Sequence, residues 1–230
     1  MSTTNDRPDP SHQPQILRLS IIGAPRLSII GAGRVGSALG PRWSEGGHTV
    51  VYGVRDPSEP RHQTLPGTAA TPADASRDAD VVVIALPWAA VEDTLTGLEV
   101  GTAVIVDATN PLAANARELT AHPELSGAEL IAGWTGSSRV IKAFNTTGAG
   151  NMANPAYPAS TSVRALMPVA GDDAAAKQTV IELATELGFD AIDAGGLSAA
   201  RDLEHLAMLW IRMAYTLGNG PDIAFALLRR

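Results

Sequence analysis

A short glycine motif has the spacing of a turn that can hold a phosphate. Gly31, Gly33 and Gly36 follow the apolar run 27–30 and precede a stretch of helical character at 34–45. In such a strand, turn and helix, the first glycine permits the tight turn, the second lets a pyrophosphate approach the backbone, and the third lets helix and strand pack closely. The free N–H groups at the start of the helix would face the anion. The motif predicts a dinucleotide site, and the alternative is a flexible glycine-rich loop.

The loop after the next predicted strand bears on the choice of coenzyme. That strand, 48–53, ends in Gly53, at the place where NAD-selective proteins usually carry an acidic side chain for the ribose. Arg55 follows, and Arg61 lies in the same loop, so guanidinium groups are available for a 2′-phosphate. We therefore predict selection of NADP(H). In the alternative interpretation, Arg55 is a solvated charge and Asp56 accepts the ribose hydroxyl.

Polar residues and prolines end three further apolar runs, at 80–87, 103–111 and 139–145. These runs are typical of parallel strands buried on both faces. Because ligands bind at the carboxyl ends of such strands, the last residues of each run are expected to surround the nicotinamide. They are Leu86, Pro87, Trp88, Thr109, Asn110, Pro111, Phe144, Asn145 and Thr146. Strand punctuation by the prolines, turn formation by the asparagines and packing by the tryptophan are the alternatives.

Strands and helices alternate along the chain, which predicts an α/β fold with a doubly wound (Rossmann) parallel sheet and right-handed crossovers. A strand at 163–171, a helix at 173–187 and a short strand at 189–194 then lead into a long helix at 198–217. We therefore expect a small C-terminal α/β region that ends in a long helix. The predicted division is a tail at 1–25, a dinucleotide-binding domain at 26–147 and a substrate and dimerisation region at 148–230.

Two local features concern the ends of the chain. Residues 1–17 are polar and carry no export signal, so we expect a disordered tail. The heptapeptide RLSIIGA occurs at 18–24 and again at 26–32, and only the second copy leads into the glycine turn.

On the long helix, an apolar stripe predicts core or a homodimer interface, and Arg201, Glu204 and His205 are expected to be surface groups.

Composition narrows the class of protein further. With 230 residues and a formal net charge of −7, the chain has no electrostatic footprint for nucleic acid or an anionic membrane. We expect a soluble, cytoplasmic protein. The absence of cysteine excludes disulfides, thiolate metal sites and cysteine nucleophiles, and the five histidines show no metal-ligand spacing, so no metal site is predicted.

Several motifs together resemble the NADPH-dependent reductases of the coenzyme F420 oxidoreductase family, and the ferric-reductase domains of certain membrane proteins are similar. The resemblance covers residues 26–230. The motifs are GAGRVG at 31–36, ALPW at 85–88, DATNP at 107–111, KAFNTTG at 142–148, VAGDD at 169–173 and the stretch 193–204.

The resemblance implies a Rossmann domain that moves hydride between NADP(H) and the deazaflavin coenzyme F420. The residues implied at the pyrophosphate are Gly31, Gly33, Arg34 and Val35, with Ala32 and Gly36 completing the turn. Arg55 is implied at the 2′-phosphate, and Leu86, Pro87 and Asn145 at the nicotinamide. Family members that prefer NADP commonly carry Ser where Val54 stands here, which predicts weaker selectivity.

The chemistry expected from this arrangement is direct hydride transfer to a small-molecule acceptor, with no catalytic side chain required. Orientation of two rings in a water-poor cleft can remove roughly 7–11 kcal/mol of barrier. Two alternatives stay open. One is an NADPH- or F420H2-dependent reductase of a small C=C, C=N or C=O substrate in specialised metabolism, with His205, Tyr157 or Tyr215 as proton donor. The other is a non-catalytic NADP-binding redox sensor.

Overall fold

A computed structural model describes residues 24–115, 118–120, 124–157 and 162–230 of the chain. The tail and the first heptapeptide copy that the sequence analysis singled out lie almost entirely outside the described residues.

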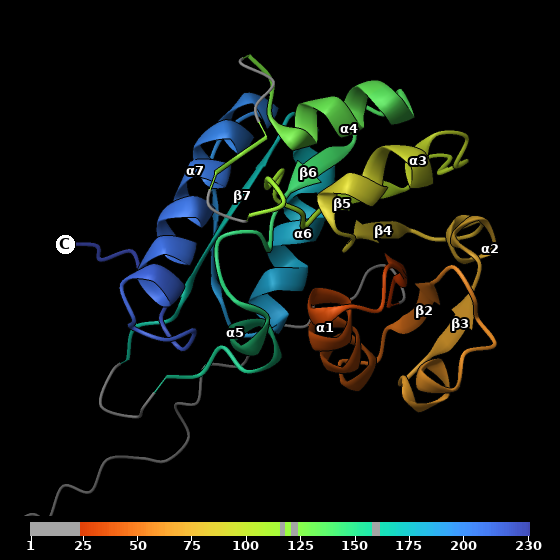
Figure 1. Cartoon of the computed structure of the whole chain (residues 1–230), viewed down its shortest axis with the longest axis horizontal. Helices are drawn as coiled ribbons and strands as arrows, with labels where there is room; N and C mark the ends of the chain where they lie inside the picture. Colours follow the sequence, from red (N-terminus) through yellow and green to blue (C-terminus); the bar gives the residue numbers. More distant parts are fainter. Residues whose placement is uncertain (1–23, 116–117, 121–123, 158–161) are drawn as a thin grey trace, which may run out of the picture.

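Eight strands form one sheet in the order β3-β2-β1-β4-β5-β6-β7-β8 (Figure 1). Strands β1 to β6 run parallel to one another. The strands are β1 Arg26–Ile30, β2 Thr49–Gly53, β3 Thr68–Ala70, β4 Val81–Ile84, β5 Val104–Asp107, β6 Val140–Lys142, β7 Leu166–Gly171 and β8 Asp190–Asp193. The predicted α/β, doubly wound Rossmann class is confirmed.

The direction of the last two strands differs from the all-parallel expectation. Strand β7 pairs antiparallel with β6, and β8 pairs parallel with β7. The link from β6 to β7 contains a single five-residue helix among its described residues, so β7 starts at the carboxyl edge of the sheet instead of crossing back to the amino edge. The sheet continues past residues 147 and 148, where the domain boundary was predicted, and that division stays a prediction.

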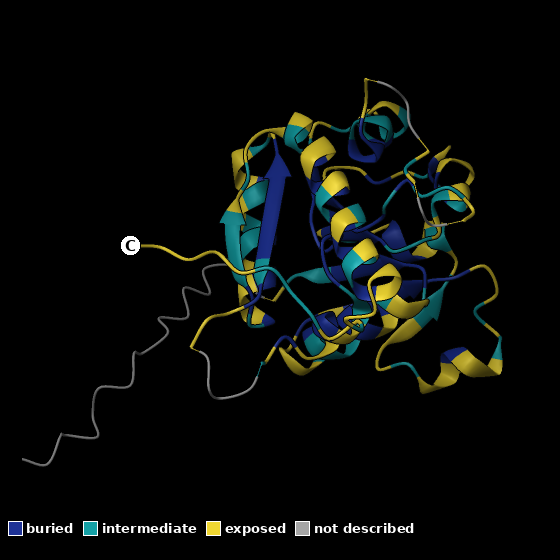
Figure 2. Ribbon diagram, turned by 60° about the vertical axis from the view of Figure 1, so that its left-hand side comes forward, coloured by how far each residue is buried: buried dark blue, intermediate teal, exposed yellow. Residues whose placement is uncertain are grey.

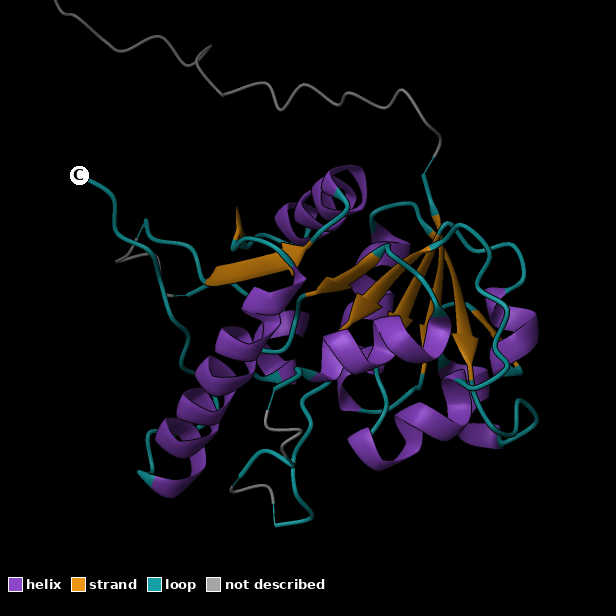
Figure 3. Ribbon diagram, turned by 90° about the horizontal axis from the view of Figure 1, so that it is seen from above, coloured by secondary structure: helices purple, strands orange, loops and turns teal. Residues whose placement is uncertain are grey.

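Helices cover both faces of the sheet, as Figure 3 shows from above. The helices are α1 Arg34–Glu45, α2 Pro72–Ser76, α3 Val91–Leu95, α4 Gly127–Thr135, α5 Ala149–Ala153, α6 Ala174–Glu186 and α7 Ala200–Ile211. Residues of α1, α5 and α6 pack on one face, and residues of α2, α3 and α4 pack on the other. Figure 2 shows the consequence, since the strands between the layers are mostly buried and the helices carry exposed residues on their outer sides.

The strands alternate their side chains between these two layers. Val81 and Val83 of β4 belong to the first core cluster, whereas Val82 and Ile84 belong to the second. All four are essentially inaccessible to solvent. Continuous apolar runs therefore predicted the central strands correctly, because a strand buried on both faces has no polar side.

Several short elements were not predicted from the sequence. The sequence analysis assigned no element between the strand at 48–53 and the apolar run at 80–87, but the structure has β3 and α2 there. Helix α2 is capped by Thr71, whose side chain accepts a hydrogen bond from the Asp74 N–H. Helix α4 begins at a capping box in which Ser126 and Glu129 bond reciprocally to each other's backbone N–H. Both signals are readable in sequence, whereas a three-residue strand such as β3 is too short for a periodic pattern.

The long C-terminal helix forms as expected, in three conformations. A 3-10 turn at Leu197–Ala199 leads into α7, which continues as a π-helical turn at Arg212–Thr216. Leu203, Ala207, Trp210 and Ala214 form its buried side. The expectation for Glu204 was wrong, because this residue is only 3% exposed and lies inside the molecule.

No helix in the part of the chain that the structure describes is long and apolar enough to cross a membrane. The cytoplasmic location and the homodimer stay predictions.

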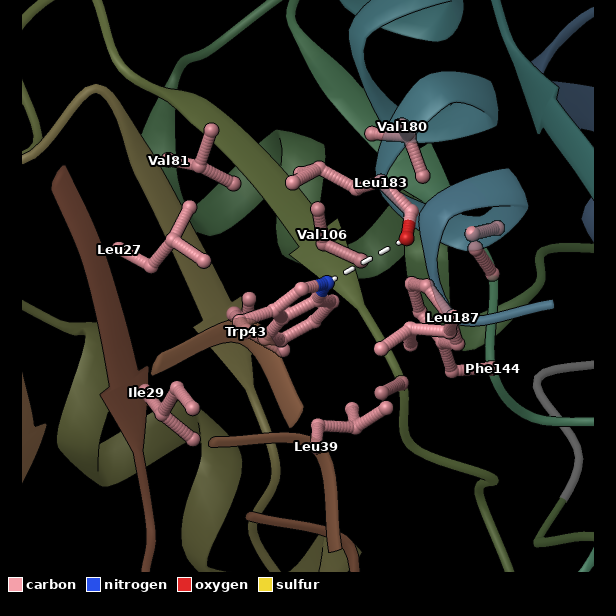
Figure 4. Packing of buried hydrophobic residues seen from close by; sticks show 14 of the residues in the cluster. Leu27, Ile29, Leu39, Trp43, Val81, Val106, Phe144, Val180, Leu183 and Leu187 are labelled. Atoms are coloured by element: carbon pink, nitrogen blue, oxygen red, sulfur yellow. Dashed lines mark hydrogen bonds between the residues drawn. The ribbon is translucent and has the colours of Figure 1, made fainter. Parts of the chain in front are cut away.

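Trp43 joins the two halves of the chain within the first core cluster (Figure 4). This α1 side chain is 1% exposed, and its indole Nε1 donates to the Leu183 carbonyl of α6 at 3.3 Å. Its ring meets the Phe144 ring edge to face, with centroids 5.6 Å apart. Trp43 therefore anchors α1, which follows the first strand, to the C-terminal helix α6.

We predict that Trp43→Ala lowers the free energy of unfolding by about 3–5 kcal/mol, because it leaves a large cavity at this junction. Urea denaturation followed by far-ultraviolet circular dichroism would measure the change. Leu209→Ala is the control, because Leu209 is 48% exposed and its truncation should change stability by no more than about 0.5 kcal/mol. Equal effects of the two substitutions would contradict the role given to Trp43.

Candidate functional site

The glycine turn after β1 is shaped by two backbone contacts. Gly31 adopts a φ of +109°, and its N–H donates to the Gly53 carbonyl at 2.9 Å. A Cβ on Gly31 would lie 2.5 Å from the Ala85 carbonyl oxygen, and a Cβ on Gly36 would lie 2.0 Å from the Gly31 carbonyl oxygen. Glycine is therefore required at both positions, and Gly36 allows α1 to pack directly on the turn.

The second glycine has different surroundings. Gly33 is exposed and stands at the N-cap of α1, and a Cβ placed on it would meet no atom within 4 Å. Arg34 is exposed beside it, and Ala32 and Val35 are half-buried against the core. The N–H groups of a first helical turn have no intrahelical acceptor. An open backbone at a helix start fits a pyrophosphate, which supports the sequence-based assignment.

The loop after β2 separates buried and exposed side chains. The Val54 side chain is buried in the first core cluster, and its N–H donates to the Ala70 carbonyl of β3. Arg55 and Arg61 are exposed, and Arg61 forms a salt bridge with Glu59. The two arginines therefore present guanidinium groups at the surface, whereas the Val54 side chain is directed into the core.

Asp56 is engaged within its own loop. Its Oδ1 accepts hydrogen bonds from the Ser58 N–H at 2.9 Å and the Ser58 hydroxyl at 2.6 Å. These hydrogen bonds lower the pKa of the Asp56 carboxyl. The arrangement is an Asx-turn, which gives Asp56 a local role and so weakens the alternative in which it accepts the ribose.

Two asparagines meet at the carboxyl ends of β5 and β6. The Asn110 amide Nδ2 donates to the Asn145 carbonyl at 3.0 Å, and the Asn145 amide Nδ2 donates to the Asn110 Oδ1 at 3.0 Å. The Asn145 Nδ2 also donates to the Leu203 carbonyl of α7 at 3.0 Å. The Asn145 Oδ1 is buried and has no hydrogen-bond partner among the described residues. An unpaired acceptor of this kind would suit a carboxamide donor, which is the group that nicotinamide carries.

The loop after β4 contributes apolar groups to the same edge. Leu86 is half-buried and Pro87 is exposed. The Trp88 ring packs beside Trp134 of α4, with ring centroids 5.6 Å apart, and a Cβ added to Gly127 would lie 3.0 Å from it. Trp88 therefore packs between loop and helix, and its place beside the nicotinamide stays a prediction.

A left-handed residue precedes Asn145. Phe144 has a φ of +58°, which is uncommon for a bulky side chain and persists only when the surroundings impose it. The side chain is fully buried against Trp43, and the Phe144 N–H donates to the Met167 sulfur of β7 at 3.1 Å. The turn at Phe144 directs the chain so that Asn145 reaches Asn110.

A buried charged cluster lies directly behind these asparagines. Lys142 of β6 is inaccessible to solvent, and its Nζ donates to Asp107 Oδ2 at 2.8 Å, to the Thr109 carbonyl at 2.8 Å and to Glu204 Oε1 at 2.9 Å. An ammonium group has three donors, so all of them are used. Asp107, Lys142 and Glu204 are called the Lys142 cluster below.

The carboxylates of the Lys142 cluster have further partners. Asp107 Oδ1 accepts from the N–H and the hydroxyl of Thr109, at 2.8 and 2.7 Å. Glu204 Oε1 also accepts from the Gly127 N–H at 2.9 Å. Burial raises the pKa of the Glu204 carboxyl against the opposing effect of Lys142, while the two carboxylates raise the pKa of Lys142 despite its own burial. The sequence analysis missed this cluster, although a lysine inside an apolar strand is a signal for it.

The proposed proton donors occupy separate surroundings. His205 is exposed on α7, and its Nδ1 lies 2.8 Å from the Arg201 carbonyl. Tyr215 is 60% exposed. The Tyr157 hydroxyl is buried, and burial raises its pKa. Among the described residues, no group of three or more histidine, aspartate or glutamate side chains could hold a metal ion.

Most of the candidate residues lie in a segment that matches a known family. Residues 26–111 match the sequence model of the family described as "NADP oxidoreductase coenzyme F420-dependent". Over these residues the chain resembles that family. The resemblance predicted from the motifs is confirmed, while Lys142, Asn145 and Glu204 lie beyond the matched segment.

Relatives of the family extend the likeness beyond residue 111. F420-dependent NADP reductase from Methanothermobacter thermautotrophicus is 28% identical over 218 residues, which cover 86% of this chain and 89% of that protein. Metalloreductase STEAP3 from Rattus norvegicus is 30% identical over 193 residues, which cover 80% of this chain. The chain spans only 37% of the length of that metalloreductase.

A solved structure shares the fold over nearly the whole chain. It comes from Arthrobacter sp. FB24 and is described provisionally as an F420-dependent NADP reductase. It superimposes with a TM-score of 0.80 at 28% identity and covers 90% of this chain and 100% of its own. The C-terminal region is therefore part of the shared architecture.

We predict different defects for two alanine substitutions in the glycine turn. Gly36→Ala should destabilise the fold by about 1–3 kcal/mol, because its Cβ would collide with backbone. Gly33→Ala should leave the melting temperature unchanged but raise the dissociation constant for NADPH about tenfold or more, because its Cβ would fill the approach of the pyrophosphate. Thermal unfolding and calorimetric titration would measure the two properties. Wild-type affinity in Gly33→Ala would contradict the assignment.

Proposed function

We propose that the chain is an NADP-linked oxidoreductase that transfers hydride between NADP(H) and the deazaflavin coenzyme F420. The observation that carries the proposal is the open backbone at Gly33, at the exposed start of α1, within a segment of the F420-dependent NADP oxidoreductase family. The residues at the strand ends are those that a nicotinamide would meet in this fold.

The chain's own residues would bind and orient the coenzyme. The turn residues Gly31 to Gly36 would hold the pyrophosphate through main-chain N–H groups, and Arg55 would face the 2′-phosphate from the surface. Arg61 supplies a second cation in the same loop. Leu86 and Pro87 would shield one side of the nicotinamide from water. Asn145 Oδ1, which has no partner among the described residues, would accept a hydrogen bond from the carboxamide.

The redox chemistry belongs to the bound coenzymes, since a dihydronicotinamide delivers hydride directly to a deazaflavin ring. The protein would contribute orientation and exclusion of water. This division of labour agrees with the residues at the strand ends, where apolar side chains and amides are present. The carboxylates of the Lys142 cluster are all paired within the protein.

The experiment that tests this function mixes the purified protein with NADPH and oxidised F420. We expect rapid loss of the deazaflavin absorbance together with oxidation of one NADPH per deazaflavin. Oxidation of NADPH only by small imines, carbonyls or activated alkenes would instead support the reductase of organic substrates. Binding of NADPH without turnover on any acceptor would support the redox sensor.

We predict that Arg55→Asp raises the Michaelis constant for NADPH about 10- to 100-fold, since a lost charge-assisted hydrogen bond amounts to about 1.5–3 kcal/mol. The constant for NADH should change by less than about threefold, because NADH has no 2′-phosphate. Steady-state kinetics with both coenzymes would show the difference. Arg77→Asp is a matched control, because Arg77 is an exposed arginine that follows α2 and leads to the amino end of β4. Equal effects of Arg55→Asp on both coenzymes would refute the 2′-phosphate role.

A further inference from the structure

The Lys142 cluster joins three separate elements at one point. Asp107 ends β5, Lys142 ends β6, and Glu204 lies in the first turns of α7. The side chains of Asp107 and Lys142 are 0% exposed, and that of Glu204 is 4% exposed. Removing three charged groups from water is unfavourable, and well-packed apolar side chains would often hold the same elements together equally well. The cluster therefore calls for a role beyond general stability.

The neighbouring residue connects the cluster to the candidate nicotinamide site. Leu203, which precedes Glu204 on α7, accepts a hydrogen bond from the Asn145 amide through its carbonyl. The Asn110 Oδ1 accepts a second hydrogen bond from the same Asn145 amide. These two bonds use the Asn145 Nδ2 donors and leave Oδ1 free. The orientation of the Asn145 amide thus depends on where α7 places the Leu203 carbonyl.

Glu204 fixes that placement from two directions. Its Oε1 accepts from Lys142 Nζ on the sheet and from the Gly127 N–H at the start of α4. A helix held at one residue by both the sheet and a neighbouring helix cannot slide or rotate without breaking a buried hydrogen bond. The carbonyl one residue earlier is then fixed as well.

We propose that Lys142 and Glu204 are positioning residues for the nicotinamide: they set the register of α7, so that Leu203 and Asn110 hold the Asn145 amide with its Oδ1 available to the carboxamide. The inference rests on the proposed function, because it requires the nicotinamide to bind at the ends of β5 and β6. Geometry at Oε1, rather than the negative charge of Glu204, carries the effect.

Three substitutions of Glu204 separate geometry from charge. Glu204→Gln keeps an oxygen acceptor at the same reach and removes the charge. Glu204→Asp keeps the charge but shortens the side chain. Glu204→Leu removes both, and it leaves Lys142 with Asp107 and the Thr109 carbonyl. If Glu204→Leu does not fold, Glu204→Asp carries the test, because it retains a carboxylate opposite Lys142.

Arg201→Gln provides a matched control on the same helix. Arg201 forms a bidentate salt bridge with Glu129 of α4, at 2.8 and 2.6 Å, which lowers the pKa of Glu129 to about 2. This contact also ties α7 to α4, but it lies on the exposed side of α7 and has no bond to Asn145. A loss of general helix docking would therefore appear in Arg201→Gln too.

The experiment compares the affinity for NADPH with the affinity for 2′-phospho-ADP-ribose, which lacks the nicotinamide ring. In Glu204→Leu and Glu204→Asp, we expect the dissociation constant for NADPH to rise about tenfold while that of the fragment changes by less than about twofold. Glu204→Gln and Arg201→Gln should bind both ligands like the wild type. Calorimetric titration gives the constants, and near-ultraviolet circular dichroism shows that each variant is folded.

The outcomes distinguish this inference from the proposed function. Wild-type protein that binds neither ligand would overturn the dinucleotide site and the inference together. Parallel losses for both ligands in Glu204→Asp, or a loss in Glu204→Gln as large as in Glu204→Leu, would overturn the inference alone. Unchanged NADPH affinity in every Glu204 variant would also overturn it.

Discussion

The ammonium group of Lys142 imposes the constraint on which the carboxyl edge of the sheet depends. A lysine that is inaccessible to solvent needs an acceptor for each of its three donors, and strand β5, the loop that follows it and helix α7 supply them. Because Asp107, Thr109 and Glu204 must all reach one atom, β5, β6 and α7 have little freedom relative to one another. The residues of the candidate nicotinamide site directly follow Asp107 and Lys142 in the chain, so the geometry of the site depends on this cluster.

Core contacts of Trp43, Phe144 and Met167 stabilise the carboxyl edge of the sheet. Trp43 ties α1 to α6 within the core, and Phe144 packs on the same ring in a left-handed conformation. The reversed direction of β7 brings Met167 to the backbone of Phe144, where its sulfur accepts the N–H. The turn between β6 and Asn145 is therefore held by an aromatic contact on one side and a strand of the C-terminal region on the other.

The sequence predicted the fold and the glycine turn well, because those parts depend on local patterns. Gly31 and Gly36 stand where backbone contacts require glycine, and the apolar runs of β4 and β5 are buried on both faces. Asn110 and Asn145 were singled out separately at strand ends, and the structure brings them together. Contacts between distant residues were not predictable in this way. From its position on an amphipathic helix, Glu204 was predicted to be a surface residue. Its partner, Lys142, lies 62 positions earlier on β6, and no local pattern indicates that contact. Strand β3 was missed because three residues show no periodicity.

The inward orientation of Val54 has an evolutionary consequence. Its side chain belongs to the core and its N–H to the ladder with β3, whereas Arg55 and Arg61 extend from the same loop into solvent. Changes at the two arginines would leave the hydrophobic interior untouched. Under the role proposed for Arg55, a change of nucleotide preference at these arginines would therefore need no compensating change in the core.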